Sequence, residues 1–155
     1  MNNFVALSNG TTVPSFGQGT WYLGDSADTH DSEVRALRAG VAAGMTLIDT
    51  AEMYGEGRSE RLVGDAIAGI DVHGERLLEE DGSIAEPLDR SKLFLVSKVL
   101  PENAGAPEIF RSCDATLKNL GTDYLDLYLL HWIEDVPLAE TVRCMEQLVE
   151  EGKIR

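Results

Sequence analysis

Four short apolar segments of this 155-residue chain are each followed by a segment with the apolar spacing of a helix, and this alternation most constrains the fold. The strand and helix pairs that we predict cover residues 15–21 with 31–44, 46–51 with 59–70, 93–99 with 107–121, and 124–132 with 138–152. The helical segments repeat their apolar residues near a period of 3.6. Such a repeated order implies parallel strands joined by right-handed crossovers.

Parallel strands of this kind form either an open doubly wound sheet or a closed (β/α)8 barrel. A doubly wound nucleotide-binding fold carries a GxGxxG turn directly after its first strand. The glycine-rich segments GQGTWYLG (17–24) and GEGRSERLVG (55–64) both lack that spacing. The sequence therefore favours the (β/α)8 type, as a single domain over residues 1–155 of which about four strand and helix units are present.

Several local signals refine this prediction. The stretch FVALSNGTTVP (4–14) predicts a small hairpin with a two-residue turn at Asn9 and Gly10. Ser59 is expected to cap the second helix, and Pro107 and Gly121 to bound the third. The fourth helix is expected to bury one apolar face, made of Leu138, Val142, Met145 and Leu148.

Residues 71–90 have an acidic character punctuated by glycine and proline, between the second helix and the third strand. A connection from a helix to the next strand lies at the end of the sheet opposite the carboxyl ends of the strands. We therefore expect residues 71–90 to form an excursion away from the reactive side chains. His30 and His73 are expected to be solvent-facing loop residues.

The charge balance restricts the partners of the chain. A formal net charge of −14 disfavours nucleic acid and anionic membrane surfaces. The N-terminus lacks the pattern of a signal peptide, and no apolar stretch is long enough for a membrane span. Cys113 and Cys144 lie in helical apolar patterns without metal-ligand spacing, so buried free thiols and a cytoplasmic location are expected.

Polar side chains stand where three of the predicted strands end. Asp49, Lys98 and His131 each follow an apolar run that gives no other reason for an ionisable group. Because the carboxyl ends of parallel strands meet at one mouth of a barrel, we expect these groups to converge there. Tyr54 lies in the loop that follows Asp49.

These four residues suit proton transfer to a carbonyl oxygen. A tyrosine hydroxyl is a poor acid near neutral pH unless a cation stabilises its phenolate, and Lys98 is expected to supply that cation. Asp49 would hold the ammonium, and His131 would orient the substrate oxygen. Each of these residues alone also fits a structural role. Their occurrence together favours a catalytic role.

At these residues the sequence resembles the aldo-keto reductase family. The matching segments are FGQGTWYLG, LIDTAEMYGEGRSERLVGDAI, LFLVSKV and NLGTDYLDLYLLHW, in the family's order over nearly the whole chain. The resemblance implies a (β/α)8 barrel with a hairpin at its base and NADP(H)-dependent reduction of aldehydes or ketones. The segments VLPENAG and DYLDLYLLHW suggest the bacterial branch that reduces small dicarbonyls such as methylglyoxal.

The resemblance also implies a role for each site residue. Tyr54 would be the proton donor, Lys98 and Asp49 the pair that tunes it, and His131 the group that orients the substrate. The substrate pocket would be lined by Trp21, His131 and Trp132, and the nicotinamide ribose would lie near Gly19, Thr20, Trp21 and Asp49. No metal is implied.

The length of the chain departs from the family. Four strand and helix units make half of a closed barrel, and the residues that hold most of the NADP(H) molecule would belong to the other half. The chain is therefore expected to be a truncated form with little or no activity of its own, and its open sheet edges favour self-association. Two alternatives stay open: a non-catalytic half-barrel assembly module, and a metal-dependent hydrolase that uses Asp49 and His131, with Glu52 and Glu56 nearby.

Overall fold

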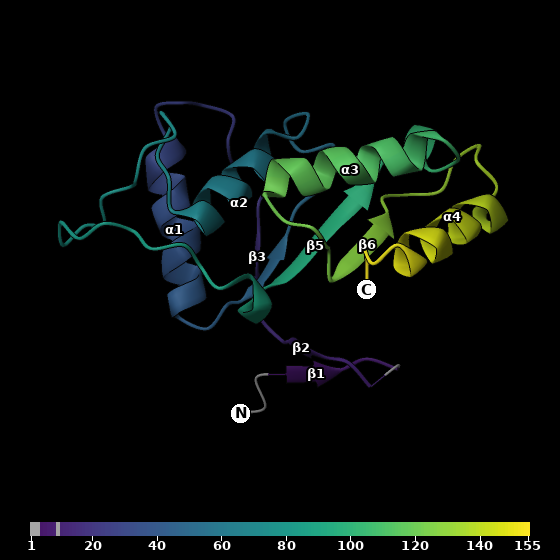
Figure 1. Ribbon diagram of the computed structural model, residues 1–155, viewed down its shortest axis with the longest axis horizontal. Helices are drawn as coiled ribbons and strands as arrows, with labels where there is room; N and C mark the ends of the chain where they lie inside the picture. The colour runs from purple at the N-terminus through teal and green to yellow at the C-terminus, as the bar shows by residue number, and fades with distance from the viewer. Residues whose placement is uncertain (1–3, 9) are drawn as a thin grey trace.

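The computed structural model describes residues 4–8 and 10–155 of the chain. The strands are β1 (Phe4–Ala6), β2 (Thr12–Pro14), β3 (Gly17–Gly19), β4 (Leu47–Asp49), β5 (Phe94–Val99) and β6 (Leu127–Leu130). The α-helices are α1 (His30–Ala42), α2 (Arg58–Ala68), α3 (Glu108–Leu120) and α4 (Leu138–Glu150), and two 3-10 helices are η1 (Arg90–Lys92) and η2 (Pro101–Asn103). Figure 1 shows the helices ranged along the sheet and the β1–β2 hairpin beyond the starting ends of the strands.

The predicted alternation of strand and helix is confirmed. Strands β3, β4, β5 and β6 form one parallel sheet in chain order, and β1 pairs with β2 in a separate antiparallel hairpin. Beyond α4, Ile154 forms a parallel bridge with Leu125, just before β6. The last residues of the chain therefore start to pair on the outer edge of β6, where a fifth strand would lie.

The two faces of the sheet have different surroundings. Side chains alternate along each strand, and the set that faces the helices, which includes Ile48, Leu95 and Val99, is buried. The set on the opposite face is more open: Leu47 is half-buried and Leu129 is 38% exposed. This second face would be the interior of a closed barrel.

Two local predictions at turns and caps were wrong. The β1–β2 pairing extends to a hydrogen bond from Leu7 N to Thr11 O, so the connection is longer than a two-residue turn; Asn9 lies outside the described residues. Ser59 does not cap α2. That helix starts after Gly57 in the left-handed conformation, and the Ser59 hydroxyl points away from the helix end.

The third helix has the predicted boundaries, with Pro107 before its first residue and Gly121 after its last. The predicted apolar face of α4 was right for Leu148, which is buried, and for Met145, which packs against the core. It was wrong for Leu138 and Val142, which are about half exposed. The other buried residues of α4 are Thr141 and Cys144.

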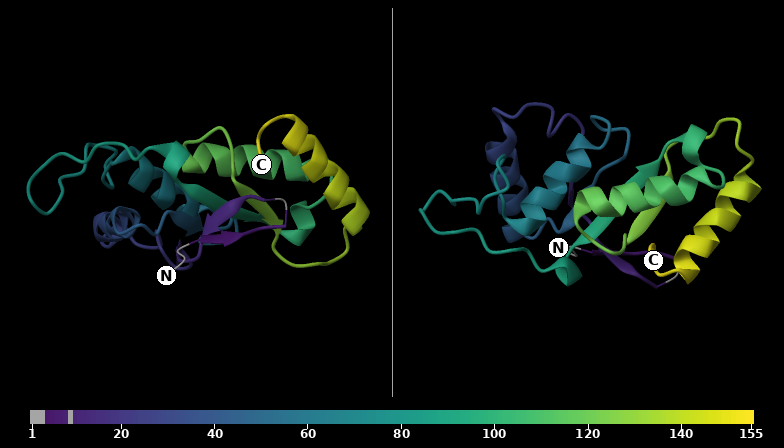
Figure 2. Two further views of the ribbon diagram at one scale, coloured as in Figure 1. Left: turned by 90° about the horizontal axis from the view of Figure 1, so that it is seen from below. Right: turned by 45° about the horizontal axis from the view of Figure 1, so that its top comes forward.

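The segment 71–90 extends away from the sheet in Figure 1 and returns along α1. The Arg35 guanidinium donates two hydrogen bonds to Leu78 O, at 3.0 and 2.9 Å. The Arg38 guanidinium forms an ion pair with Glu79 at 2.9 Å. The excursion is thus tied to α1, and both views of Figure 2 show it projecting beyond α1 and α2.

The two cysteines are buried and free, as predicted. Burial raises the pKa of the Cys113 thiol to about 12, so this sulfur stays protonated and packs as a small apolar group. Among the helices of the described residues, none is long and apolar enough to cross a membrane.

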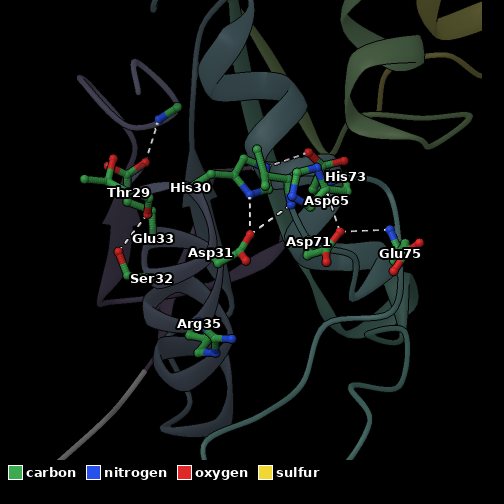
Figure 3. Close-up of polar contacts among 12 residues, drawn as sticks. Thr29, His30, Asp31, Ser32, Glu33, Arg35, Asp65, Asp71, His73 and Glu75 are labelled. Carbon is green, nitrogen blue, oxygen red and sulfur yellow. Dashed lines mark hydrogen bonds and ion pairs between the residues drawn. The ribbon is translucent and has the colours of Figure 1, made fainter. Parts of the chain in front are cut away.

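His30 is not the solvent-facing loop residue that we expected. It is the first residue of α1, and its ring lies between two carboxylates, with Nδ1 3.0 Å from Asp31 Oδ1 and Nε2 3.0 Å from Asp65 Oδ2 (Figure 3). Asp31 Oδ1 also accepts a hydrogen bond from Val72 N at 2.9 Å. His30 therefore joins α1 to α2 and, through Asp31, to the start of the excursion.

This arrangement predicts a pH-dependent contribution to stability. Burial lowers the pKa of His30, but the hydrogen bonds and charges of Asp31 and Asp65 raise it by more, so its folded-state pKa lies above 6.5. A raised pKa means that the stabilisation is fully present below pH 6.5 and is lost as the pH rises through the folded-state value. We expect His30→Gln to reduce the free energy of unfolding by about 1 kcal/mol or less at acidic pH, and by less above the folded-state pKa.

Urea unfolding of both proteins across this pH range measures the difference. The matched control is His73→Gln, because His73 is an exposed histidine of the neighbouring loop. This variant controls for the exchange of histidine for glutamine at an exposed position. A difference for His30→Gln that does not change with pH would contradict the bridging role of the imidazole.

Candidate active site

Three predicted site residues share the open face of the sheet. Asp49 pairs in register with Val96 of β5, and Lys98 pairs with Leu129 of β6. Because side chains alternate along a strand, Asp49 and Lys98 point to the same face, and His131, two residues beyond Leu129, continues it. All three lie where the strands end, at one mouth of the half barrel.

Lys98 is the centre of this group. Its ammonium lies 2.8 Å from Asp49 Oδ1 and 2.9 Å from Asp49 Oδ2. It also donates to Thr50 O at 2.9 Å and to Tyr54 Oη at 3.2 Å. The side chain is only 14% exposed. An ammonium has three protons, and these three partners take them all, so Lys98 is held in one position.

This contact sets the direction of the Tyr54 hydroxyl proton. An ammonium only donates, so Tyr54 Oη accepts the hydrogen bond from Lys98. The hydroxyl proton must then point away from Lys98, where an outside acceptor can take it. The geometry suits a proton donor.

His131 stands on the other side of Tyr54. The two rings meet edge to face, with their centroids 5.8 Å apart. Burial, and then the positive charge of Lys98, lower the pKa of His131 although Asp49 and Glu52 act in the opposite direction. The imidazole is therefore neutral at neutral pH, and its buried Nδ1 has no hydrogen-bond partner among the described residues. A neutral imidazole keeps one N–H donor and one acceptor nitrogen, but the unpartnered Nδ1 is enclosed by the protein and cannot itself meet a ligand.

The two tryptophans lie on either side of this pair. The Trp21 ring stacks with Tyr54 at a centroid distance of 6.2 Å and is 61% exposed. The Trp132 ring lies 4.8 Å from the His131 ring and is 40% exposed, with Nε1 donating to Glu134. Both rings therefore flank the Tyr54 and His131 pair and are open to solvent.

Gly19 and Thr20 carry the turn beside Asp49. Gly19 is exposed, and a Cβ built on it would meet no atom within 4 Å, so there is open space next to its backbone. Thr20 is fully buried, and its hydroxyl donates to Asp49 O at 3.1 Å. Of the residues predicted near the nicotinamide ribose, Gly19, Trp21 and Asp49 are accessible to a ligand, whereas the Thr20 side chain is enclosed.

The carboxylates near Asp49 do not form a metal site. Glu52 Oε1 accepts from Leu100 N at 2.6 Å and from Asn103 Nδ2 at 3.0 Å, which holds the loop after β5. Both oxygens of Asp49 already contact the Lys98 ammonium. Within residues 4–8 and 10–155, no group of three His, Cys, Asp or Glu side chains is arranged to hold a metal ion.

Sequence reasoning missed two buried polar residues behind the site. The Ser59 hydroxyl lies 3.0 Å from Thr20 O and 2.7 Å from Leu23 O, which holds the turn that carries Trp21. Glu60 is buried next to it. A signal was present, because Glu60 falls on the same helical face as the apolar Val63 and Ile67 at spacings of three and seven.

Comparison with known proteins gives one consistent result. The sequence model of the Aldo/keto reductase family matches residues 15–155. The chain is 46% identical over 151 residues to methylglyoxal reductase YeaE of Escherichia coli (strain K12), covering 97% of this chain and 46% of the relative. It is 33% identical over 150 residues to aldo-keto reductase YhdN of Bacillus subtilis (strain 168), covering 94% of this chain and 43% of that protein.

Solved structures agree with the sequence comparisons. An aldo/keto reductase from Klebsiella pneumoniae, solved in complex with NADP and acetate, is similar over 100% of this chain and 48% of its own, at 46% identity and a TM-score of 0.83. The chain thus spans about half the length of the relatives it matches. The predicted fold, the first half of a (β/α)8 barrel, is confirmed. The chain belongs to the aldo/keto reductase family.

Proposed function

We propose that a protein carrying this chain reduces aldehydes or ketones to alcohols with NADP(H), and that Tyr54 donates the proton. NADPH, when bound, supplies the hydride to the carbonyl carbon. The proton for the carbonyl oxygen then leaves Tyr54 Oη. The observation that carries this proposal is the 3.2 Å contact from Lys98 Nζ to Tyr54 Oη, which turns the hydroxyl proton outward.

The surrounding residues support the same reaction. Negative charge develops on the carbonyl oxygen as the hydride arrives, and a donor placed beforehand stabilises that charge. We propose that His131, a neutral imidazole next to the Tyr54 ring, orients this oxygen, and that Asp49 keeps Lys98 in place. Trp21 and Trp132 would form the walls of the substrate pocket.

A narrower substrate class follows from the relatives. The similarity to a protein named methylglyoxal reductase supports small dicarbonyls as substrates. The structural relative solved with NADP supports NADP(H) as the cofactor. The two buried free thiols fit the reducing cytoplasm. We propose that the remaining contacts to NADP(H) come from the strands that complete the barrel.

The 155-residue chain by itself is expected to bind NADPH only weakly. Binding costs several kcal/mol of lost translational and rotational freedom, and the residues that we propose for the cofactor would contact only its nicotinamide end. Titration of NADPH against the fluorescence of Trp21 and Trp132 should show no saturation at micromolar concentrations. N-acetyltryptophanamide corrects for light absorbed by the cofactor. Saturable micromolar quenching would show that this half of the barrel suffices for binding.

One observation favours a second candidate function, a half-barrel assembly module. The open face of the sheet carries Leu129, 38% exposed, and Phe16 before β3 is 73% exposed. Exposed apolar surface of this kind is usually covered by another protein surface. Such a module would bind NADPH no better than the isolated half barrel, and a protein containing it would not reduce carbonyl compounds.

A further inference from the structure

Glu60 is a buried acid that the proposed reaction does not use directly. It lies in the first turn of α2, on the helix-facing side of the sheet, and is 1% exposed. Its Oε1 accepts hydrogen bonds from Ser97 Oγ and Thr116 Oγ1, both at 2.8 Å, and its Oε2 accepts from Asn119 Nδ2 at 3.0 Å. All three donors are uncharged side chains.

Stability alone does not account for this residue. A carboxylate removed from water costs free energy that neutral donors recover only in part. An apolar side chain of similar size is often at least as stabilising in such a place. Since Val63 and Ile67 on the same face pack in the apolar core, an aliphatic residue at position 60 would continue that core.

The position of Glu60 relates it to both members of the proton-donating pair. On one side, Tyr54 O accepts a hydrogen bond from Ser59 N at 3.3 Å, so the loop of Tyr54 is attached to the residue before Glu60. On the other side, Glu60 binds Ser97, the residue before Lys98. Lys98 Nζ in turn donates to Tyr54 Oη, so a continuous series of hydrogen bonds and backbone links joins Glu60, Lys98 and Tyr54.

We infer that Glu60 is a positioning residue, which sets the distance between Tyr54 and Lys98 by holding Ser97 of β5 against the start of α2. This inference rests on the proposed carbonyl reduction. Its effect passes through the Ser97 hydroxyl, because that bond reaches the strand of Lys98. The bond from Thr116 reaches α3, which carries no residue of the site.

Two matched variants separate positioning from stability. Ser97→Ala and Thr116→Val each remove one fully buried hydroxyl that lies 2.8 Å from the same oxygen of Glu60. We expect them to lower the melting temperature by similar amounts. Only Ser97→Ala should lower kcat, by about tenfold, with KM for NADPH unchanged, because it alone loosens the strand that aims Lys98. Thr116→Val should keep the parent's kcat.

The measurement uses the protein that carries this chain together with the strands that complete the barrel, and follows the loss of NADPH with a small dicarbonyl substrate. Ser97→Cys is the second variant if Ser97→Ala loses its fold, because a thiol fills the same space but is a weak donor. Its kcat should also fall. If the parent protein is active and the kcat values of Ser97→Ala and Thr116→Val are equal, the positioning role of Glu60 is overturned while the proposed function stands. An inactive parent overturns the proposed function and this inference with it.

Discussion

Tyr54→Phe is expected to reduce the rate of carbonyl reduction by at least about a hundredfold in the protein with a complete barrel, because general acid catalysis contributes a factor of that size or more. Phenylalanine keeps the ring that stacks with Trp21 and meets His131 edge to face. It removes only the hydroxyl that accepts from Lys98. Binding of NADPH should therefore be unchanged, while kcat and kcat/KM fall together. Steady-state kinetics and a cofactor titration measure the two effects.

The matched control is Tyr22→Phe. Tyr22 belongs to the same aromatic group, since its ring stacks on Trp21 with a centroid distance of 4.8 Å, but it is 68% exposed. Removing its hydroxyl should leave kcat close to that of the parent. Turnover by Tyr54→Phe at near the parent rate would remove Tyr54 as the acid.

The convergence of the site could be predicted because it depends on local rules. A side-chain period of two and a parallel register are sufficient to bring Asp49, Lys98 and His131 to one face and one end of the sheet. The contact of Tyr54 with Lys98 is different. A loop residue has no period, so the chemistry of a tyrosine acid suggested Lys98 as its partner, but spacing alone did not predict the contact.

The wrong predictions share a physical cause. His30 was expected in solvent because its partner Asp65 lies 35 residues away on another helix. The buried face of α4 was predicted only in part, because that helix has apolar residues on more than one side and periodicity alone does not say which side is covered. Thr141 is buried although it is polar, whereas Val142 next to it is about half exposed. Such choices depend on tertiary packing, which a single sequence does not contain.

Buried polar residues are the hardest to predict, and they matter most for the geometry of the site. Glu60 fits the apolar face of α2 by position but not by chemistry, so a search for hydrophobic residues passes over it. Its three donors come from β5 and α3. Only the folded arrangement shows that these donors exist, and therefore that a buried carboxylate is tolerated there.

Lys98→Met is expected to lower kcat by about a hundredfold or more, since removing one preorganised donor from a catalytic site typically costs that much. Methionine keeps an unbranched apolar chain of similar length but donates no hydrogen bond. Asp49, Thr50 O and Tyr54 Oη would all lose their common partner. Lys92→Met is the control, because the Lys92 side chain is 77% exposed and lies outside the site, and its kcat should match that of the parent.

Asp49→Asn is expected to have a smaller effect than Lys98→Met, about tenfold in kcat, because Lys98 would still donate to Thr50 O and Tyr54 Oη. The double variant tests whether the two residues act as one unit. If Asp49 acts by holding Lys98, its removal has no further consequence once Lys98 is gone, and the double variant should show the kcat of Lys98→Met alone. If the two losses in kcat multiply in the double variant, Asp49 contributes to the reaction separately. The role of Asp49 would then not be to hold Lys98 next to Tyr54.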